Sequence, residues 1–452
     1  MANANSLGYA HCADRTVRSY RDRSKLASMS NPPGGISATP DRVAVVGAGM
    51  IGLSTAWFLQ ERGIDVTVIE RGRAGAAASW GNAGWLTPAL AGPLPEPAVL
   101  RYALRTALRP ASPIYVPPTA IPHLAGFLLR FARNSTPARW ERSMAALAGL
   151  NAGALEAFGL LEAGGVTSGT HEADPFLAAY RSEAEAAPLR AEIEAVSRVT
   201  GRGEPEYELI DGDRARELVP ALSIEVGAAV RIHGQRFIDP TVFVARLRDA
   251  VIARGGRIRE NTEVTAIEER ASGISILDEQ YDAVVLATGA WLGERAREWG
   301  VRRQVVAGRG YSFMIPAVAG VSAPLYFPAQ RVACTPREGG LRVAGMMEFR
   351  AADAPLDPRR IRAISDAVRP LLRTDGPGAA DLDATTEQWV GSRPCTADGL
   401  PIIGRTRSAR VFAAGGHGMW GMVFGPVTGR LLAERIATGR PVPELDPFDP
   451  RR

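Results

Sequence analysis

Two short apolar runs and the helix-like stretch between them open the patterned part of the chain. Residues 43–46 and 66–69 are rich in β-branched side chains, as is typical of buried strands. Between them, Ala56 and Leu59 fall at helical spacing, and Gly63 follows where a helix would end. The pattern therefore predicts a β-α-β unit.

The same alternation returns later in the chain. Residues 239–256 are amphipathic and end in two glycines, so they predict a helix. Strands are expected at 257–269, 274–277 and 281–291. From Val411 onward the sequence again combines a strand, a glycine turn and a helix, so the first domain is expected to resume twice.

The intervening segments have a different character. A proline-rich passage, 93–122, leads into stretches that predict helices and antiparallel strands. The expected helices lie at 130–161 and 184–200, and the expected strands at 175–179, 310–315 and 341–349.

The order of these signals predicts an α/β protein in which a Rossmann-like nucleotide-binding domain is interrupted by a discontinuous α+β domain on an antiparallel or mixed sheet. Residues 1–40 are expected to form a disordered N-terminal tail, within which Met29 could be a later start. The expected nucleotide-binding parts are 41–105, 227–304 and 385–452, and the expected substrate-domain parts are 106–226 and 305–384.

Composition narrows the classes of function. The chain has 452 residues, 46% of them hydrophobic, which is enough for two packed cores. The net charge of +5 comes from arginines scattered among acids, so we expect no nucleic-acid partner. Three dispersed cysteines form neither a disulfide framework nor a zinc site, so we expect no bound metal and a cytoplasmic location. The longest uncharged runs are broken by proline and glycine, which argues against a membrane span.

The first apolar run leads into the sequence GAGMIG, in which Gly47, Gly49 and Gly52 have the spacing of a dinucleotide-binding turn. Such a turn brings backbone N–H groups and the positive end of a helix dipole to a pyrophosphate. Glu70 ends the second expected strand, where its carboxylate can bind both ribose hydroxyls and disfavours NADP. The turn alone leaves FAD and NAD open.

Two later segments favour FAD. The sequence ATGAW, 287–291, follows a strand far down the chain, where FAD proteins of this build bring a second turn to the cofactor. The turn after Val411 has N–H groups that could face the flavin N1 and C2 oxygen, where negative charge accumulates on reduction. A plain NAD dehydrogenase has no use for this third element.

The chain resembles the D-amino acid oxidase superfamily of flavoenzymes, and within it the bacterial D-amino acid dehydrogenases of the small-subunit type. Five motifs carry the resemblance beside the first glycine turn, namely ASWGNAGWLTP (78–88), GYS (310–312), GMMEF (345–349), GSRPCTADGLPIIG (391–404) and GGHGMWGMVFGPVTG (415–429). The resemblance implies non-covalent FAD. The candidate cofactor-binding residues are Gly47, Gly49, Met50, Ile51, Gly52, Glu70, Arg71, Ser79, Asn82, Ala83, Gly84, Val264, Thr288, Gly289, Trp291, Gly416, Gly418, Met419, Gly421 and Met422.

Three candidate catalytic residues follow from the same resemblance. Arg393 is implied to pair with the substrate carboxylate, for which a guanidinium is suited by charge and shape. His417 is interpreted as positioning the flavin rather than as a base, because the family transfers the α-hydrogen as hydride. Tyr311 could roof the substrate or belong to the core. Cys395 does not match the register of the covalent flavin link in sarcosine oxidases.

The implied reaction is oxidation of a small amino acid, of D configuration, by hydride transfer from the α-carbon to flavin N5. The imino acid then hydrolyses to a 2-oxo acid and ammonia. Glycine, sarcosine or D-hydroxyproline are alternative substrates, and oxygen or a quinone is the electron acceptor. A tRNA-modifying flavoenzyme and a partner-binding subunit with structural FAD are the rival classes.

One group of arginines has no role in the implied reaction. Arg101, Arg105 and Arg109 are expected to share a helix face, followed by apolar residues up to Phe131. This group predicts either a solvated face or a peripheral contact with the inner face of a membrane. An oligomer is also left open.

Overall fold

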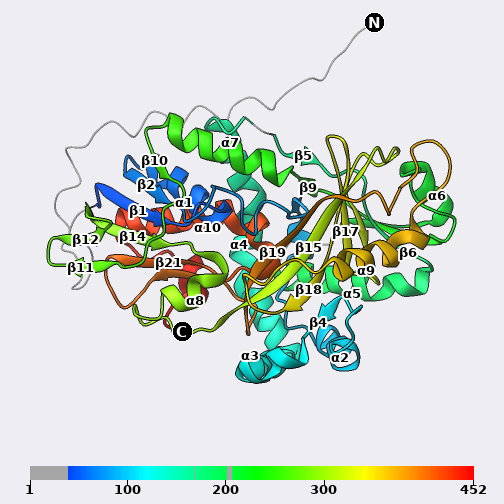
Figure 1. Cartoon of the computed structure of the whole chain (residues 1–452), viewed down its shortest axis with the longest axis horizontal. Helices are drawn as coiled ribbons and strands as arrows, with labels where there is room; N and C mark the ends of the chain where they lie inside the picture. Colours follow the sequence, from blue (N-terminus) through cyan, green and yellow to red (C-terminus); the bar gives the residue numbers. More distant parts are fainter. Residues whose placement is uncertain (1–38, 168, 201–205) are drawn as a thin grey trace, which may run out of the picture.

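The computed structural model describes residues 39–167, 169–200 and 206–452, which form two sheet-based halves side by side (Figure 1). The expected tail, 1–40, lies almost entirely outside this range. Long strands connect the halves, and the C-terminal segment returns to the same half as the first strand (Figure 1).

The first half is built on a six-stranded sheet in the order β10-β2-β1-β14-β21-β20. Neighbouring strands are parallel except for the last pair, β21 and β20. The strands are β1 (Arg42–Val46), β2 (Asp65–Ile69), β10 (Arg257–Arg259), β14 (Ala283–Leu286), β20 (Ile402–Arg405) and β21 (Val411–Gly415). Three separate stretches of the chain thus build one sheet, and the expected Rossmann-like α/β architecture is confirmed.

Apolar side chains cover both faces of this sheet. On one face, α1 (Met50–Gln60), α4 (Pro137–Ala163), α7 (Pro240–Ala253) and α10 (Gly421–Thr438) enclose the largest buried cluster. On the other face lie α8 (Leu292–Arg295) and a small antiparallel sheet of β11 (Glu268–Arg270), β12 (Gly273–Ile276) and β13 (Glu279–Tyr281). The central strand β1 is therefore buried from both sides, which explains its continuous apolar sequence.

The second half is built on a nine-stranded, mostly antiparallel sheet in the order β19-β15-β18-β17-β16-β6-β8-β7, with β4 paired to β18. Its strands are β4 (Ile114–Tyr115), β6 (Phe176–Tyr180), β7 (Tyr207–Asp211), β8 (Ala228–Ile232), β15 (Val305–Pro316), β16 (Leu325–Phe327), β17 (Val332–Arg337), β18 (Gly340–Phe349) and β19 (Thr386–Thr396). A three-stranded sheet of β3 (Trp85–Leu86), β9 (Arg236–Phe237) and β5 (His171–Glu172) lies apart from both larger sheets.

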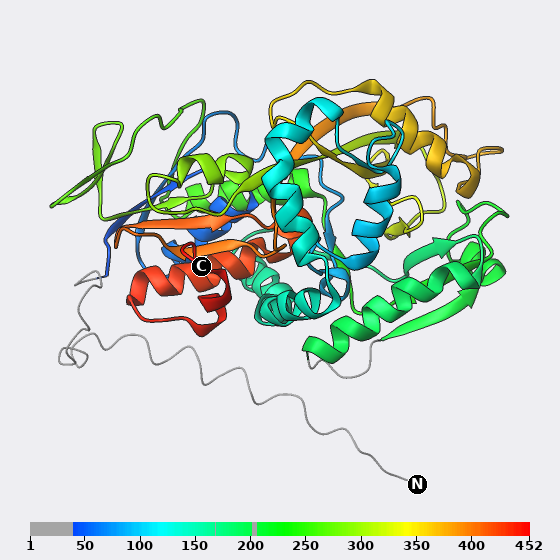
Figure 2. The ribbon, with the colours of Figure 1, turned by 90° about the horizontal axis from the view of Figure 1, so that it is seen from below.

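Helices cover the second sheet as well. One cluster buries α6 (Gly212–Leu218) and α9 (Pro358–Val368) against the sheet, and a second buries α5 (Glu183–Thr200). A further cluster fastens α2 (Pro97–Thr106) and α3 (Ile121–Asn134) to β15 and β18. Figure 2, viewed from below, shows α2 and α3 together on the outside of this half.

Among the described helices, one is long and apolar enough to cross a bilayer, namely α4. Half of its most apolar window is buried inside the protein. Leu147, Leu150 and Phe158 lie in the core that α4 shares with α1 and α10. This packing is that of a core helix.

Several expected elements differ from the observed ones. The expected strand 257–269 is interrupted, because the backbone N–H groups of Asn261 and Thr262 donate to Gly72 and Glu70 instead of continuing the sheet. The expected helix 130–161 is divided, because Ser135 ends α3 and Pro137 starts α4. Strands β7 and β8 were not expected as elements of the fold. The helix expected to carry Arg101, Arg105 and Arg109 is α2, which ends at Thr106 and so leaves out Arg109.

Two strands, β8 and β19, belong to a different half of the protein from the one expected. The division placed 227–304 and 385–452 with the nucleotide-binding domain, yet β8 and β19 belong to the second sheet. β8 pairs with β6 and β7, and β19 pairs along β15. The backbone hydrogen bonds of these strands, which no local pattern reveals, decide the assignment.

Candidate active site

A cavity of about 540 Å³ opens where the carboxyl ends of β1, β2 and β14 meet the turn before α10 and the strand β19. Its volume lies in the range of small-molecule sites, roughly 300–1,000 Å³. Its wall is made of Ala352 and of residues within six stretches of the chain, 46–51, 69–82, 262–264, 287–295, 389–394 and 414–422. The site is thus assembled from segments that lie hundreds of residues apart.

The first glycine turn has the geometry that a pyrophosphate requires. Gly47 has φ +108, and a Cβ there would lie 2.4 Å from the carbonyl oxygen of Ala287. A Cβ on Gly52 would lie 1.8 Å from the Gly47 oxygen, so this glycine closes the turn against the helix rather than lining the cavity. Gly49 is different, because a Cβ there would meet only Ser79 Oγ at 3.5 Å. The space in front of Gly49 belongs to the cavity.

The wall around this turn fits a dinucleotide. The carboxylate of Glu70 accepts hydrogen bonds from the N–H groups of Ala48 at 2.8 Å and Gly72 at 2.9 Å. A carboxylate has about four acceptor positions, so two remain for ribose hydroxyls. Thr288 Oγ1 is buried and has no hydrogen-bond partner among the described residues. At the edge of the cavity, the Arg71 guanidinium stacks on the Trp291 ring at 3.6 Å.

Most of the candidate cofactor-binding residues line this cavity, but four do not. Gly84 has φ +78 and packs against the Ile238 oxygen, while the Ala83 carbonyl accepts a hydrogen bond from Thr335. Gly416 turns away at φ +76 toward Thr396 and Ile402, and Gly52 lies inside the turn. These four residues shape the loops behind the wall. The remaining candidates, Gly47, Gly49, Met50, Ile51, Glu70, Arg71, Ser79, Asn82, Val264, Thr288, Gly289, Trp291, Gly418, Met419, Gly421 and Met422, form part of the lining.

Arg393 enters the cavity from β19 across the backbone of β15. A Cβ on Gly310 would lie 2.2 Å from Nη2 of Arg393, so the side chain needs a glycine beneath it. Nη1 of Arg393 donates to the Met346 carbonyl at 2.6 Å. Met346 has φ +68 beside the point where the register between β15 and β18 shifts. This bulge turns the Met346 carbonyl toward Arg393, as β-bulges near sites commonly re-aim a group.

The Arg393 guanidinium is a partly buried charge that has no carboxylate partner in the described part of the chain. No carboxylate forms an ion pair with Arg393 in the described part of the chain. Burial lowers the pKa of Arg393 below its usual value, but an arginine remains charged. An uncompensated buried charge is costly, and a bound anion would relieve that cost.

His417 lies at the start of the turn that leads into α10. Its Nε2 lies 3.0 Å from Thr428 Oγ1, and its Nδ1 is buried with no partner among the described residues. Burial lowers the pKa of His417 to about 3. The imidazole is therefore neutral at neutral pH and a weak base.

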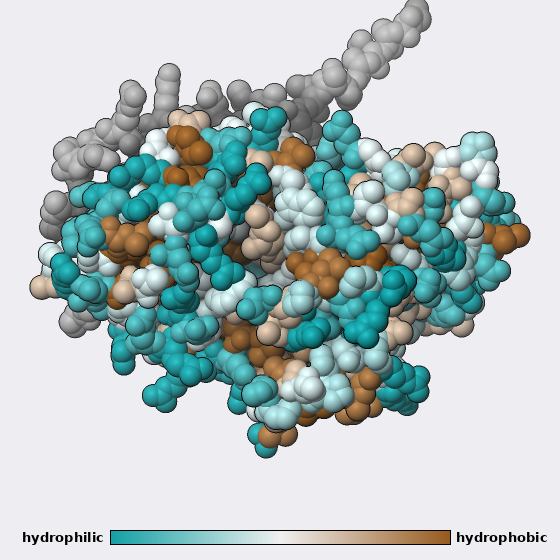
Figure 3. Space-filling view, in the orientation of Figure 1, coloured by the Kyte–Doolittle hydropathy of each residue, from teal (hydrophilic) through white to brown (hydrophobic). Residues whose placement is uncertain are grey.

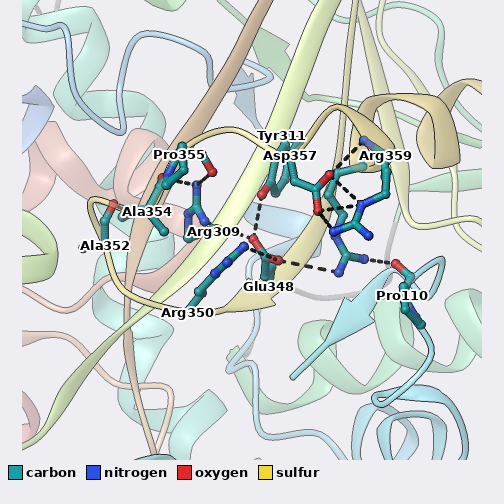
Figure 4. A network of polar contacts seen from close by, with 12 residues as sticks. Pro110, Arg309, Tyr311, Glu348, Arg350, Ala352, Ala354, Pro355, Asp357 and Arg359 are labelled. Atoms are coloured by element: carbon teal, nitrogen blue, oxygen red, sulfur yellow. Dashed lines mark hydrogen bonds and ion pairs between the residues drawn. The ribbon is translucent and has the colours of Figure 1, made fainter. Parts of the chain in front are cut away.

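Tyr311 does not roof the cavity, contrary to one of its two expected roles. Its hydroxyl donates to Glu348 Oε2 at 2.6 Å, and Arg309 Nη1 donates to the same oxygen at 3.2 Å (Figure 4). Arg360 Nη2 lies 3.6 Å from the other carboxylate oxygen. Arg393 pairs with Gly308 of β15 and lies over Gly310. Tyr311 is the next residue along β15 and so points to the opposite face of the sheet. Tyr311 thus belongs to a buried polar network.

This network also holds the loop that reaches the cavity. Nη2 of Arg309 donates to the carbonyls of Ala354 and Pro355 at 2.5 and 3.0 Å (Figure 4). Ser392 Oγ donates to the Ala352 carbonyl at 2.7 Å, and both residues line the cavity. The loop after β18 is therefore fixed from two sides.

Trp389 is a lining residue that the sequence reasoning missed. It lies on the same face of β19 as Gly391 and Arg393, because side chains alternate along a strand. Its ring passes between Gly81 and Gly391, where a Cβ would lie 2.2 and 2.0 Å from the ring. Its spacing of four residues from Arg393, which puts both side chains on one face of a strand, was the signal that could have identified it.

Neither described cysteine lines the cavity. Cys334 and Cys395 are both buried thiols, and burial raises the pKa of Cys395 to about 12. The third cysteine, Cys12, lies outside the described residues. The surroundings of Cys395 therefore favour non-covalent binding of the cofactor.

Solved structures of other proteins share this fold. The structure is similar to glycine oxidase from Geobacillus kaustophilus, with a TM-score of 0.66 and 23% identity over 91% of this chain and 98% of that one. It is also similar to glycine oxidase from Bacillus cereus ATCC 14579, with a TM-score of 0.64 and 21% identity over 88% and 96%. Iminodiacetate oxidase from Chelativorans sp. BNC1 matches with a TM-score of 0.64 and 21% identity over 90% and 99%.

Two family models match the sequence. The pyridine nucleotide-disulphide oxidoreductase model matches residues 5–76, which include the first glycine turn. The model described as FAD dependent oxidoreductase matches residues 42–435, most of the chain. When bound, FAD supplies two-electron redox chemistry, and the residues around Gly49, Glu70 and Thr288 would hold it. The chain therefore belongs to the family of FAD dependent oxidoreductases, and its cofactor is FAD.

Proposed function

We propose that this oxidoreductase oxidises the bond between the α-carbon and nitrogen of a small amino acid, preferably of D configuration. The observation that carries the proposal is Arg393, a partly buried guanidinium that lines the cofactor cavity and has no acidic partner among the described residues. A carboxylate-bearing substrate would supply the missing negative charge. The D configuration rests on the resemblance of the motifs to bacterial D-amino acid dehydrogenases.

The names of the similar structures support a substrate of this kind. Glycine and iminodiacetate, the compounds in the names of these proteins, each carry a nitrogen next to a carbon that bears a carboxylate. These proteins are below 25% identity, so their substrates do not transfer directly. The shared chemistry nonetheless agrees with an anchor for one carboxylate at Arg393.

The reaction follows from the placement of these groups. Arg393 would hold the substrate carboxylate and so fix the α-carbon at one distance from the redox cofactor. A substrate with a primary amine would lose its α-hydrogen as hydride, for which FAD would be the acceptor, and one nitrogen-bound proton to solvent, which leaves a C=N bond. Water then adds to this bond, and ammonia leaves to give the 2-oxo acid. His417 stays neutral down to low pH, so it suits a positioning role better than that of a base.

An anaerobic substrate screen tests this proposal. The purified holoenzyme is mixed with paired D- and L-amino acids, glycine, sarcosine and D-hydroxyproline, and the oxidised cofactor is followed near ~450 nm. We expect rapid bleaching with at least one D-amino acid and slow or no bleaching with its L enantiomer. Bleaching by amines that lack a carboxylate, and by no amino acid, would refute the proposal.

A further inference from the structure

The outer surface of α2 and α3 combines exposed apolar side chains with arginines. Of the eight exposed large hydrophobic side chains among the described residues, four lie here. Leu104 is 79% exposed, Leu108 61%, Leu129 54% and Ile121 36%. Figure 3 shows hydrophobic residues gathered at the lower edge of the molecule, where α2 and α3 lie in Figure 1.

The charges of this surface have one sign. Residues 97–140 contain six arginines and no aspartate or glutamate, in a chain that has 48 acids. All six are exposed, and none forms an ion pair with a described residue. Arg130 and Arg139 bond only to the neutral side chains of Gln304 and Asn134. The six are Arg101, Arg105, Arg109, Arg130, Arg133 and Arg139.

The exposed leucines are not needed for the protein core. The inner faces of α2 and α3 are already occupied, because Val99, Phe127 and Phe131 pack with Met347 and Phe349 of β18. The outer faces are thus held in a fixed orientation. Arg101 and Arg105 lie on α2, whereas Arg109, expected on the same helix face, follows in the turn after α2 ends at Thr106.

We propose that this surface docks onto an anionic lipid bilayer. The α2–α3 patch consists of Leu104, Leu108, Ile121 and Leu129 together with the six arginines named above. Apolar side chains beside cationic ones suit the boundary between lipid headgroups and acyl chains, where arginines pair with phosphates. The absence of acids over 97–140 complements a surface that is negative everywhere, whereas a protein partner would present charges of both signs at separate points.

The patch lies close to the active site. The apolar cluster beneath α2 and α3 also contacts Met419, which lines the cofactor cavity. Packed side chains thus connect the patch to the wall of the cavity. The inference does not depend on which substrate the enzyme uses.

Vesicle co-sedimentation of the full-length holoenzyme tests the proposal. Vesicles of phosphatidylcholine with phosphatidylglycerol are compared with vesicles of phosphatidylcholine alone, at low and at high salt. We expect the protein to sediment with the anionic vesicles at low salt and to be released at high salt, because salt screens the attraction. No preference for the anionic vesicles at low salt would overturn the proposal.

Matched variants locate the contact. The variants Leu104→Ser/Leu108→Ser and Arg101→Gln/Arg105→Gln/Arg109→Gln should each weaken binding, the arginine set by roughly 10-fold or more. The controls change exposed residues elsewhere, namely Ile224→Ser, which is 83% exposed in the parent, and Arg246→Gln/Arg297→Gln/Arg362→Gln. FAD content and Tm verify folding. Patch variants that bind like the parent, or controls that weaken binding equally, would contradict the assignment to this patch.

Discussion

His417 illustrates how burial alone can set the behaviour of one side chain. It is nearly inaccessible, and no acid faces it to favour the charged form. Its pKa is about 3 in the folded protein, against about 6.5 in an unfolded chain. The unfolded state therefore binds one more proton between these values, and folding stability is lost as the pH falls through this window.

This difference predicts a pH-dependent effect of His417→Gln. The parent should lose up to about 1.4 kcal/mol of stability per pH unit from this residue as the pH drops below 6.5, and the variant should lose less. Denaturant unfolding at several values between pH 7 and pH 4.5 measures it. Equal slopes for the two proteins would mean that His417 is not held neutral by burial.

The hydrogen bond between Tyr311 and Glu348 leads to a second prediction, which distinguishes a structural role of Tyr311 from a catalytic one. Tyr311→Phe removes a hydrogen bond to a buried carboxylate, so it should lower stability by about 1–3 kcal/mol. Turnover should change little, because Tyr311 does not line the cavity. A variant with parental Tm and a large loss of kcat would restore the substrate-roofing role.

Single residues were predictable where a motif fixes both type and position. Glu70 was a candidate because of its distance from the glycine turn, and Arg393 because the segment 391–404 resembles that of one family; both line the cavity. Tyr311 was ambiguous, since the face on which it lies depends on the bulge between β15 and β18. Trp389 was missed because its place depends on contact with Gly81, which lies in another segment.

At the scale of elements, the glycines of the turn between β1 and α1 have different roles. The fold needs Gly52, whereas the cofactor needs Gly49. Gly49→Val should fold, because Gly49 has an ordinary φ of −82 and little protein near its Cβ. The added side chain would instead fill space that the pyrophosphate needs. We expect a folded protein with little bound FAD, measured by absorbance after gel filtration.

Gly52→Ala is the matched comparison. Its Cβ would overlap the Gly47 carbonyl, so this variant should lose solubility or show a much lower Tm. A Gly49→Val protein that retains full FAD content would contradict the placement of the pyrophosphate in front of this turn.

Regular elements with a clear period were predictable, and interrupted ones were not. The helix expected at 239–256 is α7, and Asp239 caps it by accepting from the N–H groups of Thr241 and Val242. The strand expected at 257–269 is interrupted because its backbone N–H groups donate hydrogen bonds to the loop after β2. Competing long-range hydrogen bonds of this kind leave no local pattern.

At the scale of the whole molecule, the cofactor cavity joins segments from both ends of the chain. Residues within 46–51 and 414–422 both line it. A ligand that binds only this assembled state stabilises the whole fold, by about 2.7 kcal/mol at a hundredfold excess over its Kd. Protein stripped of FAD should therefore gain Tm with added FAD.

Riboflavin serves as the control in this titration, because it lacks the pyrophosphate and adenosine. We expect it to raise Tm much less than FAD, measured by differential scanning fluorimetry with an extrinsic dye. An equal gain with riboflavin would mean that the turn at Gly49 and the carboxylate of Glu70 contribute little to binding.

The overall architecture was predictable because glycine turns recur in the order that one family uses. The exact division between the halves was not, since β8 and β19 join the second sheet through pairing with distant strands. These pairings involve residues far apart in the sequence, and only the folded chain brings them together.

The central claim is that Arg393 holds the substrate carboxylate, and steady-state kinetics of Arg393→Ala and Arg393→Lys test it most directly. With FAD occupancy measured alongside, Arg393→Ala should lose about 2–5 kcal/mol of transition-state stabilisation, or roughly 30-fold to several thousand-fold in kcat/KM, on the best amino acid from the screen. Arg393→Lys should recover only part, because lysine keeps the charge but not the two-pronged geometry. A fully FAD-loaded Arg393→Ala enzyme with near-parental kcat/KM would contradict the carboxylate anchor and, with it, the proposed amino acid substrate.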